Sequence, residues 1–438
     1  MRYPPIQPSL FIENRRRLAA LLLPKALAVV NSNDVLPTNA DGTLLHRANS
    51  DLFYLTGVEQ EESLLILFPE AHEPRNREIL FLREATPLME TWEGRKLSKE
   101  EARKRTGIER IEWLSEFPAI FHALMCEADG VYLNSNEHSR ATIEVETREA
   151  RFVRETRSRF PLHEYHRLAR LLHRLRPVKS EAEILLIRHA NAISKDGFER
   201  VARFVKPGVT EMEVEAEFAH EFIRQSGRFA YSPIIASGEN ACALHYVQND
   251  ALCRDGEMLL LDVASTYANY NSDLTRTIPV NGRFTKRQRQ VYEAVLRIFR
   301  QCAALLKPGL LPRDWKKAAD EFTEKELVDL KLLKMSEVKK QGPDKTALKK
   351  YFMHGVGHPI GLDVHDVAGI GEPIQAGWVM TCEPAIYIRE EKMGIRLENI
   401  ILVTDAGPVD LMADIPIEPD EIEGLMAGGH SRKAPRRK

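Results

Sequence analysis

Two aspartates stand eleven residues apart in the segment MLLLDVASTYANYNSDLTRT, which covers residues 258–277. Asp262 follows a run of four apolar residues, and Asp273 leads into a second strand-like stretch. Residues 266–271 lie between them and can turn the chain. The sequence therefore predicts an antiparallel hairpin that presents Asp262 and Asp273 on one face.

Two glutamates and a histidine stand further along in similar surroundings. Glu383 lies in MTCEP (380–384), Glu398 in GIRLENI (394–400), and His358 in HGVGHPIGLDVHD (354–366). Arg396 and Glu398 alternate with apolar residues, which predicts that both side chains point to one side of a strand.

Four carboxylates in apolar segments would be costly to bury unless positive charge compensates them. Burying an unpaired charge costs several kcal/mol, and a close pair of carboxylates repels by roughly 4 kcal/mol at an effective dielectric near 20. One interpretation is four unrelated acids at strand ends and a surface histidine. We favour convergence, because four carboxylates and one imidazole suit two divalent cations with a bridging hydroxide. Such an oxygen-rich set favours Mn²⁺, with Co²⁺ or Fe²⁺ open and Zn²⁺ as a substitute.

The order of these motifs resembles that of the dinuclear pita-bread metallopeptidases, within the branch of aminopeptidase P and prolidase. The resemblance is dense from Ser237 to Thr404, and NSDLFYLTG (49–57) resembles the amino-terminal domain of aminopeptidase P. It implies an α/β (α+β) fold, in which a pita-bread catalytic domain with pseudo-twofold halves follows a smaller α/β domain.

The resemblance also implies a role for each residue. Asp262 would bind one ion, His358 and Glu383 the other, and Asp273 and Glu398 both. Glu383 would carry a proton to the leaving nitrogen. The substrate-side histidines would be His245, His354 and His365. For Arg396 a charge partner of the carboxylates and a substrate contact both stay open. Asp363 and Asp366 are expected either to support the ligands or to be structural.

The implied reaction is hydrolysis of the amino-terminal Xaa-Pro bond of peptides by a hydroxide that bridges two ions. A prolidase restricted to Xaa-Pro dipeptides is the alternative. A metal-free binding relative, or a creatinase-like hydrolase, is disfavoured because all five ligands are present. The resemblance further implies a homodimer or homotetramer.

The composition bears on binding partners and on the cellular compartment. The 62 basic and 64 acidic residues nearly cancel, so no attraction to nucleic acid or membranes is expected. Five cysteines without CxxC spacing favour a reduced, cytoplasmic protein. Arg15-Arg16-Arg17 precedes too short an apolar run for a signal peptide, and a helix followed by a strand is predicted there.

A domain boundary is predicted at 176–180. Ser180 and Glu183 form a capping box that opens a helix, and Thr210 and Glu213 repeat it. Domains are expected at 1–176 and 177–426, with a basic, disordered tail at 427–438. Lys-Pro-Gly occurs at 206–208 and 307–309, as a faint internal repeat. Charge-rich amphipathic helices are expected within 315–350.

Overall fold

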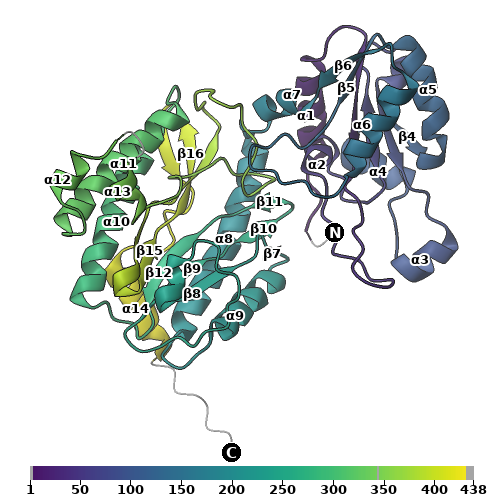
Figure 1. The fold of residues 1–438 in the computed structure, drawn as a ribbon. Helices are drawn as coiled ribbons and strands as arrows, with labels where there is room; N and C mark the ends of the chain where they lie inside the picture. Colours follow the sequence, from purple (N-terminus) through teal and green to yellow (C-terminus); the bar gives the residue numbers. More distant parts are fainter. Residues whose placement is uncertain (1–2, 343–344, 431–438) are drawn as a thin grey trace, which may run out of the picture. The chain divides into compact units, whose positions relative to one another are not determined.

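The computed structural model describes residues 3–342 and 345–430. The chain divides into two compact units, Met1–Arg176 and Pro177–Lys438 (Figure 1). Within the described residues no helix is both long and apolar enough to cross a membrane.

The amino-terminal unit is built on a mixed six-stranded sheet in the order β4-β3-β2-β1-β5-β6. Its strands are β1 (Ala26–Asn31), β2 (Leu64–Leu67), β3 (Glu78–Leu82), β4 (Arg110–Trp113), β5 (Gly130–Leu133) and β6 (Glu164–Arg167). Its helices are α1 (Pro8–Ala19), α2 (Ser50–Thr56), α3 (Pro87–Glu93), α4 (Lys99–Thr106), α5 (Phe117–Glu127), α6 (Arg148–Arg159) and α7 (Ala169–Leu175). The predicted first helix and following strand are confirmed as α1 and β1.

Aromatic packing joins α5 and α6 to this sheet. The Phe117 ring of α5 lies 5.2 Å from Phe81 of β3, and Phe121 lies 5.6 Å from Phe152 of α6. Strand β1 is buried along its whole length, because it pairs with β2 on one side and β5 on the other. The unit therefore has a core of its own.

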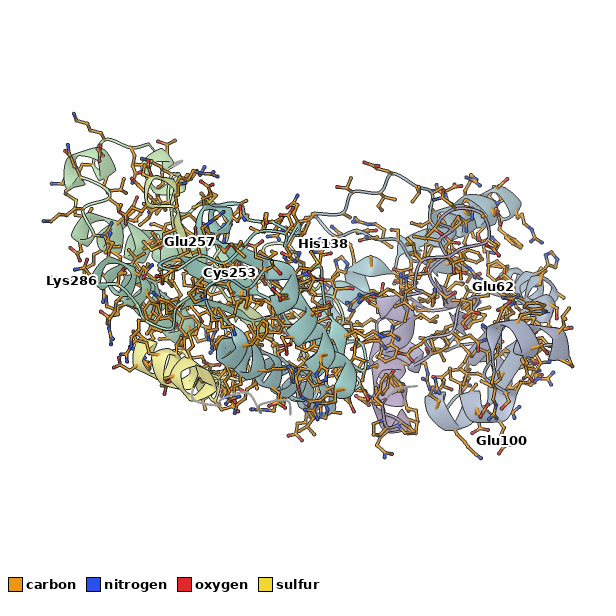
Figure 2. The ribbon with its side chains drawn as sticks, turned by 90° about the horizontal axis from the view of Figure 1, so that it is seen from below. Glu62, Glu100, His138, Cys253, Glu257 and Lys286 are labelled. Atoms are coloured by element: carbon orange, nitrogen blue, oxygen red, sulfur yellow. The ribbon has the colours of Figure 1, made fainter. Side chains whose placement is uncertain are left out.

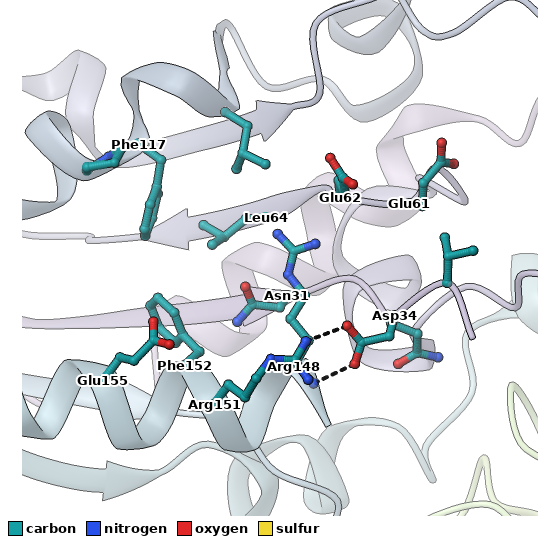
Figure 3. Close-up of a pocket in the computed structure, with 14 residues that line it drawn as sticks. Asn31, Asp34, Glu61, Glu62, Leu64, Phe117, Arg148, Arg151, Phe152 and Glu155 are labelled. Carbon is teal, nitrogen blue, oxygen red and sulfur yellow. Dashed lines mark hydrogen bonds and ion pairs between the residues drawn. The ribbon is translucent and has the colours of Figure 1, made fainter. Parts of the chain in front are cut away.

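A cavity of about 580 Å³ opens in this unit (Figure 3). Its charged lining residues are Asp34, Glu61, Glu62, Arg148, Arg151 and Glu155. Most of these charges have partners within the unit: Arg151 Nη2 lies 2.6 Å from Asp34 Oδ1, and Lys96 Nζ lies 2.5 Å from Glu61 Oε1. The cavity therefore offers little unmatched charge to a ligand.

The carboxy-terminal unit repeats one order of elements twice. Helices α8 (Glu181–Phe204) and α9 (Glu211–Arg224) precede the sheet of β8 (Ile234–Ser237), β9 (Met258–Asp262) and β12 (Thr275–Pro279). Helices α10 (Lys286–Leu305) and α11 (Pro312–Asp329) precede the sheet of β13 (Val379–Cys382), β16 (Asn399–Thr404) and β17 (Gly407–Asp410). The remaining strands are β7 (Arg228–Phe229), β10 (Ser265–Tyr267), β11 (Tyr270–Asn271), β14 (Ala385–Ile388) and β15 (Met393–Arg396).

The two Lys-Pro-Gly tripeptides occupy matching places in this repeat. Gly208 lies between α8 and α9, and Gly309 lies between α10 and α11. Both glycines have positive φ angles, of 94° and 89°, a conformation that glycine adopts without steric cost. Each amide donates to a distant carbonyl, Cys253 and Ile374 respectively, at 2.9 Å. The sequence repeat thus coincides with a repeated helix-to-helix joint.

Both predicted capping boxes are confirmed at the starts of α8 and α9. In the 315–350 segment the structure has α11, α12 (Met335–Val338) and α13 (Thr346–Lys349), while the predicted joint at 342–343 lies partly outside the described residues. Trp315 is fully buried there.

The last helix, α14 (Pro419–His430), extends into the predicted tail. Residues 427–430 are therefore helical rather than disordered, because they continue a helix that is anchored by buried Ile422 and Met426. Residues 431–438 lie outside the described part of the chain. All five cysteines are unpaired thiols, and Cys253 lies in the interior of its unit (Figure 2).

Candidate metal centre

The predicted hairpin is present. Strand β12 pairs antiparallel with β9, with Thr275 opposite Asp262, and the turn between β10 and β11 places Ala268 and Asn269 at positive φ angles. Asp262 is the last residue of β9, and Asp273 lies two residues before β12. The pairing therefore brings the two aspartates to the same end of the sheet.

Tyr231 directly links these two aspartates. Its hydroxyl donates toward Asp262 Oδ1 at 2.6 Å and Asp273 Oδ1 at 2.7 Å. One hydroxyl proton cannot fully satisfy two carboxylates, so the pair needs further positive charge. Sequence reasoning missed Tyr231, because it lies in no motif and reaches the aspartates only through the fold.

The second half of the unit contributes Glu398. The prediction of one strand through Arg396 and Glu398 needs correction: β15 ends at Arg396 and β16 begins at Asn399. The break arises because β15 pairs with β14 whereas β16 pairs with β13. Glu398 instead bridges to Thr275, whose hydroxyl donates to Glu398 Oε2 at 2.7 Å.

His358 is held against β13 by its backbone. Its amide donates to Thr381 Oγ1 at 3.0 Å, and its carbonyl accepts from the Thr381 amide at 2.8 Å. His358 Nδ1 lies 3.0 Å from the Pro359 carbonyl. This contact places the ring proton on Nδ1 and leaves the Nε2 lone pair available to a metal.

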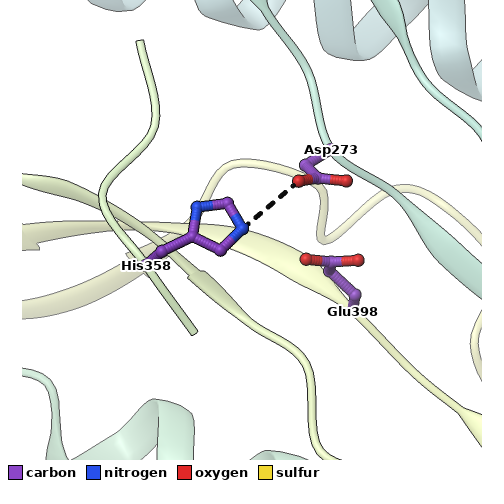
Figure 4. Close-up of side chains that lie close together, drawn as sticks. All are labelled: Asp273, His358 and Glu398. Carbon is purple, nitrogen blue, oxygen red and sulfur yellow. Dashed lines mark ion pairs between the residues drawn. The ribbon is translucent and has the colours of Figure 1, made fainter. Parts of the chain in front are cut away.

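The Nε2 atom of His358 faces the carboxylates (Figure 4). It lies 3.6 Å from Asp273 Oδ2, the contact drawn in Figure 4. It also lies 3.7 Å from Glu383 Oε1. Donor atoms of Asp273, His358 and Glu398 all lie within 4.8 Å of one another. Five side chains from separate segments are thus linked in one region, through these contacts and through Tyr231.

The electrostatics of this cluster favour a bound cation. Burial, followed by repulsion from Asp262, raises the pKa of Asp273 well above its ordinary value. Burial, followed by repulsion from Asp273, does the same to the pKa of Glu398. The exposed fractions of these two residues are only 5% and 2%. Divalent cations would allow both groups to ionise, so the carboxylate and imidazole donors fit metal binding.

Comparisons with known proteins agree with this chemistry. The profile of metallopeptidase family M24 matches residues 186–405, and that of the aminopeptidase P amino-terminal domain matches residues 11–132. The Xaa-Pro aminopeptidases of Escherichia coli K12 and Haemophilus influenzae are 32% and 34% identical to this chain. These alignments cover 96% and 95% of this chain, and 98% and 96% of the relatives.

The chain belongs to metallopeptidase family M24.

Solved structures show the same fold over nearly the whole length. A structure described as a putative aminopeptidase P from Bacillus anthracis has a TM-score of 0.89 at 31% identity, covering 97% of this chain and 99% of that one. Zinc-substituted E. coli aminopeptidase P, in complex with product, has a TM-score of 0.86 at 32% identity, covering 98% and 100%. The expected α/β architecture, an aminopeptidase-P-like domain followed by the metallopeptidase domain, is therefore confirmed.

Arg396 lies against the carboxylates of this M24 chain. Its Nη2 donates to Asp262, its Nη1 to the Tyr387 hydroxyl at 2.7 Å, and its Nε to Thr275 Oγ1 at 3.3 Å. Its exposed fraction is 4%. In the structure Arg396 is a charge partner of Asp262.

His354 lies on the other side of Glu383. Its Nδ1 is 3.8 Å from Glu383 Oε2, and its Nε2 is 3.0 Å from the Tyr387 hydroxyl. Burial, followed by the charge of Arg396, lowers the pKa of His354 to about 3. His354 is therefore neutral at neutral pH.

The other two histidines are exposed and near the cluster. The His365 ring lies 4.3 Å from the His358 ring, nearly perpendicular to it. His245 is close enough to His354 to influence the pKa of that residue. All three histidines singled out in the sequence thus have links to the candidate site.

Proposed function

We propose that this M24 peptidase is a dinuclear Xaa-Pro aminopeptidase. The observation that supports it most is the buried cluster of Asp273, His358 and Glu398, with three donor groups within 4.8 Å. Full-length similarity to proteins named Xaa-Pro aminopeptidase supports the substrate class and does not favour prolidase.

We assign the metal ligands as the sequence resemblance implied. Asp262 would hold one ion, His358 and Glu383 would hold the other, and Asp273 and Glu398 would be shared by both. A pair of divalent ions supplies Lewis acidity and lowers the pKa of a shared water. Mn²⁺ is the ion we propose, with Co²⁺, Fe²⁺ and Zn²⁺ as alternatives, because the donor set is rich in carboxylate oxygen.

The side chains around the cluster carry the proton and orient the peptide. Glu383, positioned between His358 and His354, takes a proton from water and delivers it to the proline nitrogen as the bond breaks. His365 donates a hydrogen bond to the carbonyl oxygen of the cleaved bond. Neutral His354 lines the pocket of the proline ring, and His245 contacts the substrate beside the attacked carbon.

The proposal also covers the domains of the chain, its cellular compartment and its oligomeric state. Residues 1–176 form the aminopeptidase-P-like domain, and the catalytic domain follows from residue 177. A reduced, cytoplasmic location is supported by five unpaired cysteines. A homodimer or homotetramer follows from the family resemblance, and light scattering of the purified protein would test it.

Three peptides test the substrate class. Ala-Pro-Ala should have a higher kcat/KM than Ala-Pro, because an aminopeptidase accepts a chain that continues beyond proline. Ala-Ala-Ala should be cleaved poorly, because the site is built for a tertiary amide without an N–H group. A clear preference for Ala-Pro would make the protein a dipeptidase, and comparable cleavage of Ala-Ala-Ala would refute proline specificity.

Removal of metal tests the chemistry. Activity should disappear in chelator and return with Mn²⁺ or Co²⁺. Full activity of the stripped enzyme, with no divalent ion detected by elemental analysis, would sink the dinuclear mechanism. It would also revive the alternative of a hydrolase that uses this fold without metals.

A further inference from the structure

Lys179 and Asp366 form a buried ion pair beside the metal centre. Lys179 Nζ donates to Asp366 Oδ2 at 3.0 Å, and the side chain of each residue is only 1% exposed. Lys179 lies just before α8, far from Asp366 in sequence, and its amide donates to the Gly377 carbonyl at 2.9 Å. The donor is therefore fixed at both its backbone and its side chain.

Stability alone is a weak reason for such a pair. Removing two charges from water is costly, and replacing a buried ion pair by neutral groups of similar volume is often neutral or stabilising. A buried pair is better explained where it fixes the position of a neighbouring group. Asp366 directly follows His365 and belongs to the same segment as His358.

Asp366 is tied to His358 through one carbonyl. The Asp366 amide donates to the Pro359 carbonyl at 2.9 Å, and His358 Nδ1 lies 3.0 Å from the same oxygen. Asp366 also follows His365 directly, and the His365 ring packs against His358. The position of Asp366 therefore determines where the acceptor for His358 Nδ1 lies.

The ion pair packs closely against the neighbouring loop. A Cβ atom on Gly361 would lie 2.3 Å from Asp366 Oδ2 and 2.9 Å from Lys179 Cε, so the pair packs directly on the backbone of this glycine. The Gly361 carbonyl accepts from the Asn271 amide at 2.8 Å. Asn271 lies two residues before Asp273, so the same loop is connected to both halves of the ligand set.

We propose that Lys179 is a positioning residue of the metal centre: through Asp366 and the Pro359 carbonyl it orients His358 so that Nε2 faces the carboxylates. The inference rests on the proposed function, because it concerns the same site. Lys179 touches neither metal nor substrate in this assignment. Partners that orient a metal-binding histidine typically contribute about 10–100-fold to metal affinity or activity.

The test replaces both charges at once with Lys179→Met and Asp366→Asn. Asparagine keeps the Oδ1 acceptor that receives the Val367 amide at 2.9 Å, and no unpaired charge stays buried. We expect a folded protein whose unfolding temperature is close to that of the wild type. Its affinity for Co²⁺, measured by titration of the stripped protein, should fall about 10–100-fold, and the Co²⁺ absorption spectrum should change.

Arg15 and Glu78 offer a matched control pair in the amino-terminal unit, with Arg15 Nε 3.0 Å from Glu78 Oε2 and the Arg15 side chain 1% exposed. Arg15→Met with Glu78→Gln should leave Co²⁺ affinity and spectrum unchanged. Should the first variant not fold, Lys179→Arg keeps the charge but displaces the donor, and the same weakening is expected.

Wild-type Co²⁺ affinity and spectrum in the folded variant would overturn the inference. Failure of the proposed function has a different signature, in which the wild-type protein binds the metal but does not cleave Ala-Pro-Ala. The KM of the metal-saturated variant should stay near that of the wild type while kcat falls, because the pair acts on the metal ligand and not on peptide binding.

Discussion

The two units of this chain both bury carboxylates, but they stabilise them by different means. Glu149 in the amino-terminal unit accepts from the Asn31 amide and from Asn31 Nδ2, both at 2.9 Å. Burial raises the pKa of Glu149 to about 7, so this carboxyl can take up a proton and remain buried. Asn31 alone therefore donates to both carboxyl oxygens of Glu149.

The carboxy-terminal unit instead gathers several carboxyls at one place. Burial and the nearby Asp262 raise the pKa of Asp273, burial and Asp273 raise the pKa of Glu398, and their hydrogen-bond donors, Tyr231 and Thr275, are neutral hydroxyls. A buried acid by itself is thus no sign of a metal site. Convergence of several acids from separate strands, with an imidazole among them, distinguishes the second unit from the first.

The largest expected effect comes from removing a bridging ligand. Asp273→Ala or Glu398→Ala deletes a proposed contact to both ions, so bound metal and activity should both be lost. The loss in kcat/KM should exceed about 100-fold, the upper end for groups that only support a ligand. Glu149→Gln is the matched control, and it should keep wild-type metal content and kcat. Wild-type rates in the bridge variants would contradict the ligand assignment.

A smaller loss is expected for a group that contacts the reacting peptide but no ion. His365→Ala should lower kcat by about 10²–10³-fold, the scale of removing one donor to a developing oxyanion. Its metal content, by elemental analysis, should match the wild type. Loss of metal together with activity would instead place His365 among the residues that hold His358 in place.

The protonation of Glu149 gives the amino-terminal unit its own pH dependence. Between the ordinary pKa near 4.5 and the folded value of about 7, the folded state holds a proton that the unfolded state has lost. This stabilisation is complete at low pH and is lost as the pH rises to about 7. It amounts to at most about 3 kcal/mol.

Glu149→Gln should remove that dependence. Urea unfolding of the full chain at pH 5 and pH 7.5 measures it, as the difference in the free energy of unfolding between the two pH values. The difference should shrink in the variant, and its neutral amide should make the variant relatively more stable at pH 7.5. An identical pH dependence in both proteins would show that Glu149 is not protonated in the fold.

The proposed ligands were recognisable in the sequence because their acids lie within apolar segments and because the order of the motifs resembles that of a known family. The hairpin of β9 and β12 followed from the spacing of Asp262 and Asp273, and the capping boxes of α8 and α9 followed from local rules. The hairpin and the capping boxes depend on residues close together in the chain. Local pattern therefore predicted these elements.

The supporting residues could not be found in this way. Tyr231 contacts the proposed ligands Asp262 and Asp273, and Lys179 contacts Asp366, each from a segment far away in the chain. Neither Tyr231 nor Lys179 lies in a distinctive pattern. The break between β15 and β16 depends on pairing with two different strands, which alternation along one strand does not reveal. Such contacts exist only in the folded chain.

The smallest effects are expected from helix-capping variants, which should lower the free energy of unfolding without changing the catalytic rate. Ser98 caps α4 in the amino-terminal unit, accepting from the Glu101 amide, and Thr210 caps α9 in the carboxy-terminal unit in the same way. The cap of α4 lies at the surface, beside exposed Glu100 (Figure 2). Ser98→Ala should lower the free energy of unfolding by about 1 kcal/mol, and Thr210→Ala should cost a similar amount. Urea unfolding measures both losses of stability.

The kcat and metal content of the Ser98 variant should equal those of the wild type, because α4 supplies no ligand. A fall in kcat of this variant at full metal occupancy would show that the amino-terminal unit takes part in turnover beyond folding.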